Sequence, residues 1–153
     1  MRRVLLLLVS IPLLGTSIRA VRFPENPIIT PTSSQTLGEN INGPSLLRVP
    51  SWVQRPLGRY YLYFAHHGGK FIRLAYALRL SGPWKVHEPG TLRLEQAPRC
   101  NDHIASPDIH VDSVRREILM YFHCPAGRKA RVLARRFPQR RPAACPVVLR
   151  GDG

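Results

Sequence analysis

Acidic side chains, long apolar runs and helical periodicity are all scarce in this sequence. Among its 153 residues, 9 are Asp or Glu and 23 are Lys or Arg, which gives a formal net charge of +14. Beyond residue 20 no apolar stretch is long enough for a membrane-spanning helix, and no long window places apolar residues at helical spacing. The sequence therefore argues against a helical bundle and against a membrane-spanning domain.

The excess positive charge is concentrated near the C-terminal end. Residues 126–153 carry 8 basic side chains against Asp152, whereas residues 21–125 carry 12 basic and 8 acidic ones. Such a net charge is typical of proteins that bind nucleic acid or anionic surfaces, but the central part of this chain is only mildly basic. The tail also lacks interleaved aromatic residues for base stacking, so we expect no nucleic acid partner.

Residues 1–20 have the pattern of a signal peptide. Arg2 and Arg3 precede the apolar run Val4–Leu14, which is too short to cross a bilayer, and Ala20 is a suitable cleavage position. A buried N-terminal helix is the alternative, which Pro12 inside the run disfavours. We therefore expect a secreted or periplasmic protein that is not held in the membrane after cleavage.

The cysteine count is odd, which leaves at least one thiol unpaired. Cys100 and Cys124 lie in the part of the sequence with strand patterns, and Cys145 lies in the tail. The sequence leaves the pairing of Cys100 with Cys124 open. If they pair, closing the loop contributes about 3 kcal/mol in the chain-entropy model.

The sequence does contain a succession of short strand patterns bounded by Gly and Pro. An extended lead-in, residues 21–43, is rich in Pro, Thr, Ser, Asn and Gly, and four apolar runs follow it closely. The runs are Pro44–Val49, Arg59–Ala65, Phe71–Ala77 and Pro83–Val86. Their spacing predicts an antiparallel meander of short strands.

The second run is apolar on both faces. Its two faces carry Tyr60, Leu62 and Phe64, and Tyr61, Tyr63 and Ala65. A sheet with one wet face would alternate apolar and polar residues, so this sheet must be covered on both sides. Sheets stacked around an axis would provide that cover, and so would a sandwich with a third layer. If the chain supplies too few sheets, its end sheets expose apolar faces.

The strand pattern recurs about sixty residues later. Pro107–Val111 is similar to Pro44–Val49, 63 residues earlier, and Tyr121 corresponds to Tyr63, 58 residues earlier. A repeat of this size, built from four short strands, is typical of a propeller blade. We therefore divide this region into a first blade, residues 44–90, and an incomplete second blade, residues 91–125.

Residues 126–153 depart from the pattern. Arg, Ala and Pro dominate there, and neither strand alternation nor a core pattern continues. We expect a disordered basic tail. It is either the product of a frameshift near codon 127 or a genuine basic segment.

Several segments carry a resemblance to a known family. Phe71–Trp84, which ends in Gly82, Pro83 and Trp84, resembles the blade-closing segment of glycoside hydrolase family 43 and related five-bladed propellers. Asn42–Val49 and Ala105–Val111 are similar to the first and second blade openings of that family. The resemblance covers about residues 27–125. It implies an all-β fold, a partial five-bladed β-propeller with antiparallel four-stranded blades.

The resemblance also implies inverting glycosidase chemistry, in which one carboxylate activates water and a carboxylic acid protonates the leaving oxygen. It would place an Asp before the Pro of each opening, but these positions are Gly43 and Ser106. The third blade, which would supply the acid, is missing from this chain. Whether the protein is an enzyme is therefore open.

Other polar residues lie near the expected site and could move protons or bind sugar hydroxyls. The candidate catalytic residues are Asp108, Asp102 and His103. The candidate substrate-binding residues are His66, His67, Asn42 and Trp52. Structural interpretations stand beside these, because His, Asp and Asn are common in turns and loop caps. A metal site is a disfavoured alternative, because no pair among the residues that could form it has zinc-finger spacing: His66, His67, Cys100, His123 and Cys124. We expect neither a metal nor a cofactor.

Two functional hypotheses follow. The chain is a fragment of a secreted, carbohydrate-active, glycoside hydrolase-like propeller and is inactive as an isolated chain. Alternatively, it is a non-catalytic carbohydrate-binding or interaction module that kept the blades and lost the carboxylates. Both hypotheses name a poly- or oligosaccharide as the partner.

Overall fold

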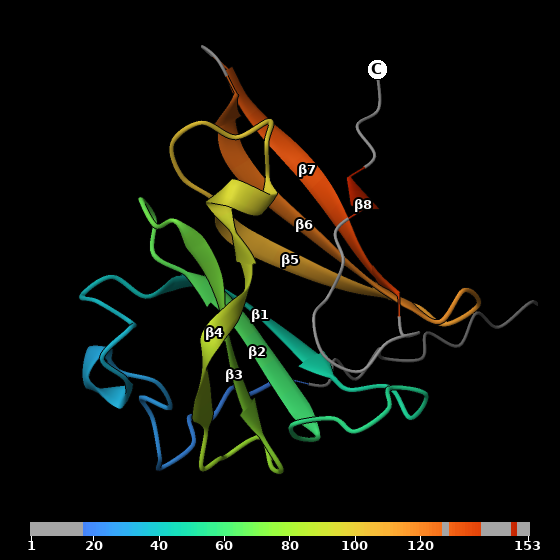
Figure 1. The fold of residues 1–153 in the computed structure, drawn as a ribbon. Coiled ribbons are helices and arrows are strands. Elements are labelled where there is room, and N and C mark those ends of the chain that lie inside the picture. Colours follow the sequence, from blue (N-terminus) through green and yellow to red (C-terminus); the bar gives the residue numbers. More distant parts are fainter. Residues whose placement is uncertain (1–16, 127–128, 139–147, 150–153) are drawn as a thin grey trace, which may run out of the picture.

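The computed structural model describes residues 17–126, 129–138 and 148–149, which form two antiparallel four-stranded sheets (Figure 1). The first sheet has the order β1-β2-β3-β4, and its strands are Asn42–Arg48, Tyr60–Ala65, Phe71–Ala77 and Lys85–Arg93. The second has the order β5-β6-β7-β8, and its strands are Ala105–Asp112, Glu117–Ala126, Lys129–Pro138 and Val148–Leu149. Two short 3-10 helices, η1 (Pro31–Ser33) and η2 (Leu94–Gln96), precede and follow the first sheet. The predicted all-β class and antiparallel meander are confirmed.

The two sheets meet through their first strands and share a core. Strand β5 lies against β1, β2 and β3 of the first sheet (Figure 1). Alternate residues of β6 point into the space between the sheets, because a strand turns successive side chains to opposite faces. The buried residues between the sheets include Tyr61, Tyr63, Ile72, Leu74, Leu92, Ile104, Ile118, Met120 and Phe122.

The two apolar faces of β2 are confirmed, with different cover on each. Tyr61, Tyr63 and Ala65 pack into the core between the sheets, whereas Phe64 and Leu62 pack on the opposite face. That opposite face is covered by the lead-in, whose Leu37 is completely buried against it. Ile29 and Ile41 add to this contact, and Trp84 and Val86 of the Gly-Pro-Trp region pack there too.

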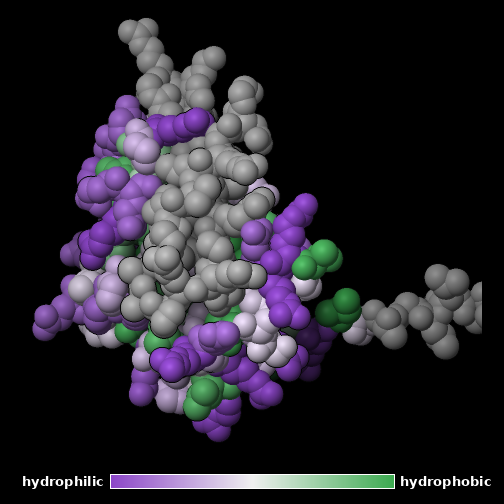
Figure 2. Space-filling model, turned by 45° about the vertical axis from the view of Figure 1, so that its right-hand side comes forward, coloured by the Kyte–Doolittle hydropathy of each residue, from purple (hydrophilic) through white to green (hydrophobic). Residues whose placement is uncertain are grey.

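This arrangement corrects the expectation that the first sheet leaves an apolar face exposed. The lead-in has little regular structure, as predicted, but a few apolar residues spaced along it are enough to cover β2 and β3. Glu88 of β4 fixes the lead-in further, because Ser34 and Thr36 both donate their hydroxyl hydrogens to its carboxylate. Figure 2 shows apolar residues in small scattered groups among hydrophilic ones on the visible face.

The tail is the second correction. Residues 129–138 form β7, which pairs with β6 from Glu117↔Pro138 to Ala126↔Lys129, and Val148–Leu149 form β8 beside β7. The expectation of a tail without strands is therefore wrong for these residues. Backbone pairing along the open edge of β6 satisfies main-chain hydrogen bonds whatever the side-chain pattern, so an irregular sequence does not exclude a strand.

Several predictions fall outside the described residues. Residues 1–16, which hold most of the predicted signal peptide, are among them, and so is Cys145. Residues 17–20 are described as exposed chain without secondary structure. In the described part of the chain no helix is long and apolar enough to span a membrane. The frameshift and the export of the protein stay predictions.

Candidate functional site

Both sheets begin with the same local irregularity. Gly43 and Ser106 each precede a proline, each has a positive φ, 59° and 49°, and each lies at a shift in strand register. The two residues also lie against each other: a β-carbon on Gly43 would be 3.0 Å from Cα of Ser106. The two positions that the family resemblance assigns to aspartate are therefore neighbours, and neither carries a carboxylate.

A hydrogen bond joins the same two strands a few residues further on. The backbone N–H of Ile109 on β5 donates to the side-chain oxygen of Ser45 on β1, at 3.0 Å. Ser45 and Ile109 thus help to hold the two strand openings together.

The β2–β3 turn and the loop before β5 lie at this same end of the sheets. Asn42 at the start of β1 pairs with Ala65 at the end of β2, and Ala105 at the start of β5 pairs with His123 of β6. The turn and the loop are tied by a backbone hydrogen bond from the Ile104 N–H to the Gly69 carbonyl, at 3.1 Å. The result is one end of the molecule where polar loops converge over the two strand openings.

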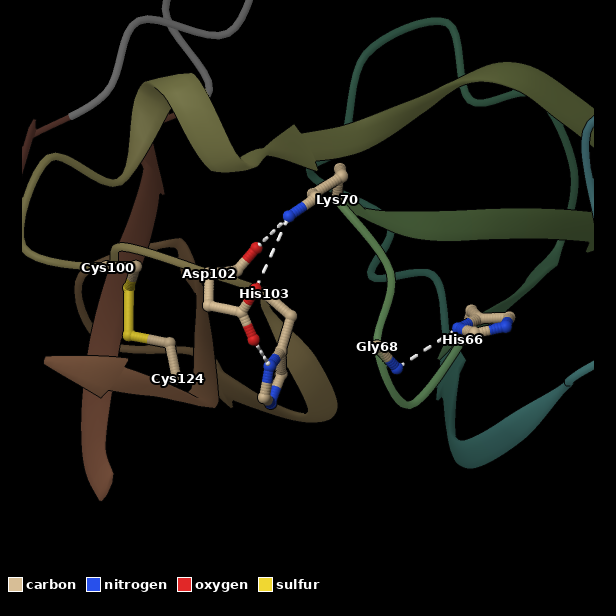
Figure 3. A network of polar contacts seen from close by, with 7 residues as sticks. All are labelled: His66, Gly68, Lys70, Cys100, Asp102, His103 and Cys124. Carbon is tan, nitrogen blue, oxygen red and sulfur yellow. Dashed lines mark hydrogen bonds and ion pairs between the residues drawn. A yellow bond between two sulfur atoms is a disulfide. The ribbon is translucent and has the colours of Figure 1, made fainter. Parts of the chain in front are cut away.

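Lys70, Asp102 and His103 form a polar chain across this end (Figure 3). Nζ of Lys70 donates to the backbone carbonyl of Asp102 and lies 3.6 Å from its carboxylate. Nδ1 of His103 lies 2.8 Å from the other carboxylate oxygen. The hydrogen bond from His103 and the nearby charge of Lys70 lower the pKa of Asp102. The ionised carboxylate fixes the orientation of the His103 ring, and among the described residues no hydrogen bond to Nε2 is found.

His103 is also one of three histidines that gather here. The ring centres of His67, His103 and His123 are separated by 6.0, 6.1 and 5.7 Å for the pairs 67–103, 67–123 and 103–123. They come from the β2–β3 turn, the loop before β5 and strand β6, respectively. Burial, together with the charges of His103 and His67, lowers the pKa of His123. We call this group the histidine trio.

The structure thus brings together three of the candidate residues, Asp102, His103 and His67, and adds two that the sequence did not single out for this site. Lys70 is charged and lies in a Gly-flanked turn, which gives no signal of its own. The repeat gives no signal for His123, because Tyr121 and Phe122 correspond to Tyr63 and Phe64, and His123 therefore corresponds to Ala65. Only the register of β5 and β6 shows that it lies opposite Ala105.

Three other candidate residues have different surroundings. His66 closes the β2–β3 turn, since its Nδ1 accepts from the Gly68 N–H at 3.0 Å, and its ring lies away from Asp102 and His103 (Figure 3). Asn42 donates to the side-chain oxygen of Asn40 at 2.6 Å. Trp52 is partly buried against the core between the sheets. Their role in sugar binding stays a prediction.

Asp108 has a partner of its own. Its carboxylate lies 2.8 Å from Nε2 of His110 on the same strand, and the His110 ring contacts Tyr121. Asp108 is two positions beyond Ser106, a spacing that in a regular strand places both side chains on one face. The register shift between Ala105 and Asp108 interrupts that simple alternation.

A disulfide borders the site. Cys100, in the loop before β5, is bonded to Cys124 of β6, with their Cα atoms 5.6 Å apart (Figure 3). The pairing that the sequence left open is therefore present. It fixes the loop that carries Asp102 and His103 against the strand that carries His123.

The described residues also line a separate apolar pocket of about 450 Å³ between the lead-in and β1–β2. Asn26 and Asn42 are its polar lining residues, and no charged residue is among those that line it. This pocket lacks the groups needed for proton transfer, so the converging loops are the better candidate site.

No protein family matches this chain, and no solved structure does. The chain is similar to an uncharacterized protein of Acanthamoeba polyphaga mimivirus, with 41% identity over 122 residues. The match covers 67% of this chain and 34% of the viral protein, so the chain spans about a third of the length of that curated relative.

Proposed function

We propose that this chain is the first part of a secreted, carbohydrate-active β-propeller of the glycosidase type and is inactive as an isolated chain. The observation that carries the proposal is the contact between the two strand openings. Gly43-Pro44 and Ser106-Pro107 share a positive φ, a register shift and a position at the start of neighbouring first strands. First strands that meet in this way are expected of adjacent propeller blades, whose ligand site lies where the blades converge.

The length of the viral relative supports a longer parent protein. It is about three times as long as the part that this chain matches, and further four-stranded blades would fit in that length. The disulfide supports passage through an oxidising compartment, because such bonds persist mainly in exported proteins.

The absence of carboxylates at the two openings supports inactivity of the isolated chain. Glycoside hydrolysis needs a carboxylic acid and a carboxylate on either side of the scissile bond. Position 43 is glycine and position 106 is serine, and Asp102 is already paired with Lys70 and His103.

A second candidate is a binding module without turnover. The lack of a carboxylate at positions 43 and 106 favours this candidate. So do the hydrogen-bonding groups of Asp102, Lys70 and the histidine trio at the site. Such groups can bind sugar hydroxyls through hydrogen bonds, and binding, unlike hydrolysis, requires no proton transfer.

The test compares this chain with the viral relative on arabinan, xylan and agar oligosaccharides. We expect sugar release by the viral protein and none by this chain, which should bind the same oligosaccharide weakly. Binding should weaken in Asp102→Asn and Asp108→Asn but not in Glu25→Gln, which makes the same kind of change at an exposed residue of the lead-in. Binding without turnover by both proteins would favour the module, and no binding or turnover by either would contradict the carbohydrate proposal.

A further inference from the structure

The ring centres of the histidine trio lie close enough together for one transition metal ion to reach all three rings. The ring centres form a nearly equilateral triangle with sides of 5.7, 6.0 and 6.1 Å. The centre of such a triangle is about 3.4 Å from each ring centre, and a zinc ion bound through a ring nitrogen lies about 3.2 Å from the ring centre. The three rings are therefore within about half an ångström of the separation that a tetrahedral three-histidine site requires.

The hydrogen bonding of the trio fits the same chemistry. Nδ1 of His103 is bonded to the Asp102 carboxylate, so Nε2 is the nitrogen that remains to bind a ligand. A carboxylate behind a metal-binding histidine is a common arrangement, because it fixes the tautomer and makes the ring more basic. No hydrogen bond from the side chains of His67 or His123 is found within the described residues, so their nitrogens are not committed elsewhere there.

In the conformation described, no three His, Cys, Asp or Glu side chains of the described residues are placed to hold a metal ion. The rings are inclined to one another by 33°, 54° and 86°. Rotation about the bond from Cβ to the ring turns the nitrogens while it moves the ring centres only slightly. The site would thus be completed when the ion binds, on loops already fixed by the disulfide and by the Ile104–Gly69 hydrogen bond.

We propose that His67, His103 and His123 bind a divalent transition metal ion of the zinc type, with Asp102 as the positioning residue behind His103. Imidazole nitrogens suit zinc, copper and nickel rather than calcium or magnesium, which prefer oxygen. Three protein ligands leave a fourth position open to water or to an oxygen of a bound molecule. This inference does not depend on the carbohydrate proposal.

The experiment titrates zinc chloride into the full chain at neutral pH by calorimetry. The protein carries no polyhistidine tag and has Cys145→Ser, so that neither a tag nor the remaining thiol binds the ion. We expect one zinc ion per chain. His103→Gln and His123→Gln should each abolish or strongly weaken binding, and Asp102→Asn should weaken it about tenfold.

His66→Gln and His110→Gln are the matched controls, since both remove an imidazole outside the trio and should leave zinc affinity unchanged. Cobalt(II) bound to the same Cys145→Ser protein, with the trio intact, should show the visible absorption of a tetrahedral site, and this readout does not depend on the folding of any trio variant. Absence of saturable zinc binding would overturn the proposal. Equal zinc affinity in the trio variants and in the controls would also overturn it. Circular dichroism establishes that each variant is folded.

Discussion

Gly43 and Ser106 are in main-chain contact where β1 and β5 begin. They lie so close that a β-carbon on Gly43 would be 3.0 Å from Cα of Ser106. The contact is between main chains, and it therefore depends on the absence of a side chain at position 43. It also sets how closely the first strands of the two sheets approach.

Gly43→Ala should therefore destabilise the protein. The new methyl group would meet the backbone of Ser106, which a rotamer change cannot move, and alanine would also adopt a positive φ of 59°. We expect a loss of about 1–3 kcal/mol in the free energy of unfolding, measured by denaturant titration.

Gly38→Ala is the control for the backbone strain alone. Gly38 has a similar φ of 66°, but its nearest neighbour is an Arg73 nitrogen at 3.9 Å, an ordinary contact. Its substitution should cost about 1 kcal/mol. If Gly38→Ala costs as much as Gly43→Ala, the close approach of Gly43 to Ser106 contributes nothing.

The disulfide should contribute strongly to stability. Cys100 and Cys124 are 24 residues apart, and a loop of that size contributes about 3 kcal/mol in the chain-entropy model. The double variant Cys100→Ser/Cys124→Ser should unfold at a correspondingly lower denaturant concentration. A reducing agent should lower the melting temperature of the unsubstituted chain and leave that of the double variant unchanged. A reductant effect that persists in the double variant would assign the effect to another thiol.

Phe64 and Phe122 test the two layers of the core separately. Both are almost completely buried, Phe64 under the lead-in and Phe122 between the sheets, so replacing either with alanine should cost about 3–5 kcal/mol. Phe64→Ala should also release the lead-in, and glutamyl endopeptidase should then cleave at Glu39 faster than in Phe122→Ala. Equal cleavage rates under native conditions would mean that the lead-in does not depend on Phe64.

Much of the fold follows from local pattern. Phe71–Ala77 was predicted with the bounds that β3 has, and the run Arg59–Ala65 differs from β2 by one residue. Short apolar runs between Gly and Pro define strands well, and the alternation in β2 assigns each side chain to a face. The strand Lys85–Arg93 extends further than the predicted run Pro83–Val86. Pro89 and Gly90 are uncommon inside strands, so its second half carries no strand pattern.

The rest depends on contacts that no local pattern encodes. Leu37 is an isolated apolar residue in a polar segment, and only its place against Phe64 shows that the lead-in is part of the core. The site is similar: the register of β5 with β6 brings His103 near His123, and the hydrogen bond from the Ile104 N–H to the Gly69 carbonyl brings His67 near His103. Asp102 and His103 were singled out because they lie just ahead of the second blade opening and could move protons, whereas Lys70 gave no such signal.

The last prediction concerns Glu88 and pH. Hydrogen bonds from Thr36 and Ser34 to its carboxylate lower the pKa of Glu88 in the folded protein. A lowered pKa means that the folded state favours the ionised form. The resulting stabilisation is fully present above the unfolded pKa, about 4.3, and is lost as the pH falls through the folded pKa.

Glu88→Gln removes the titrating group. The melting temperature of the unsubstituted chain should exceed that of Glu88→Gln at pH 7, and the difference should shrink as the pH falls from 5 toward 3, about the range in which carboxylates titrate. Glu95→Gln is the control, because no hydrogen bond to its carboxylate is found among the described residues. A difference that stays constant over this range, or that matches the Glu95→Gln control, would mean that the two hydroxyls do not hold Glu88 in its ionised form and that the lead-in is fixed by its apolar residues alone.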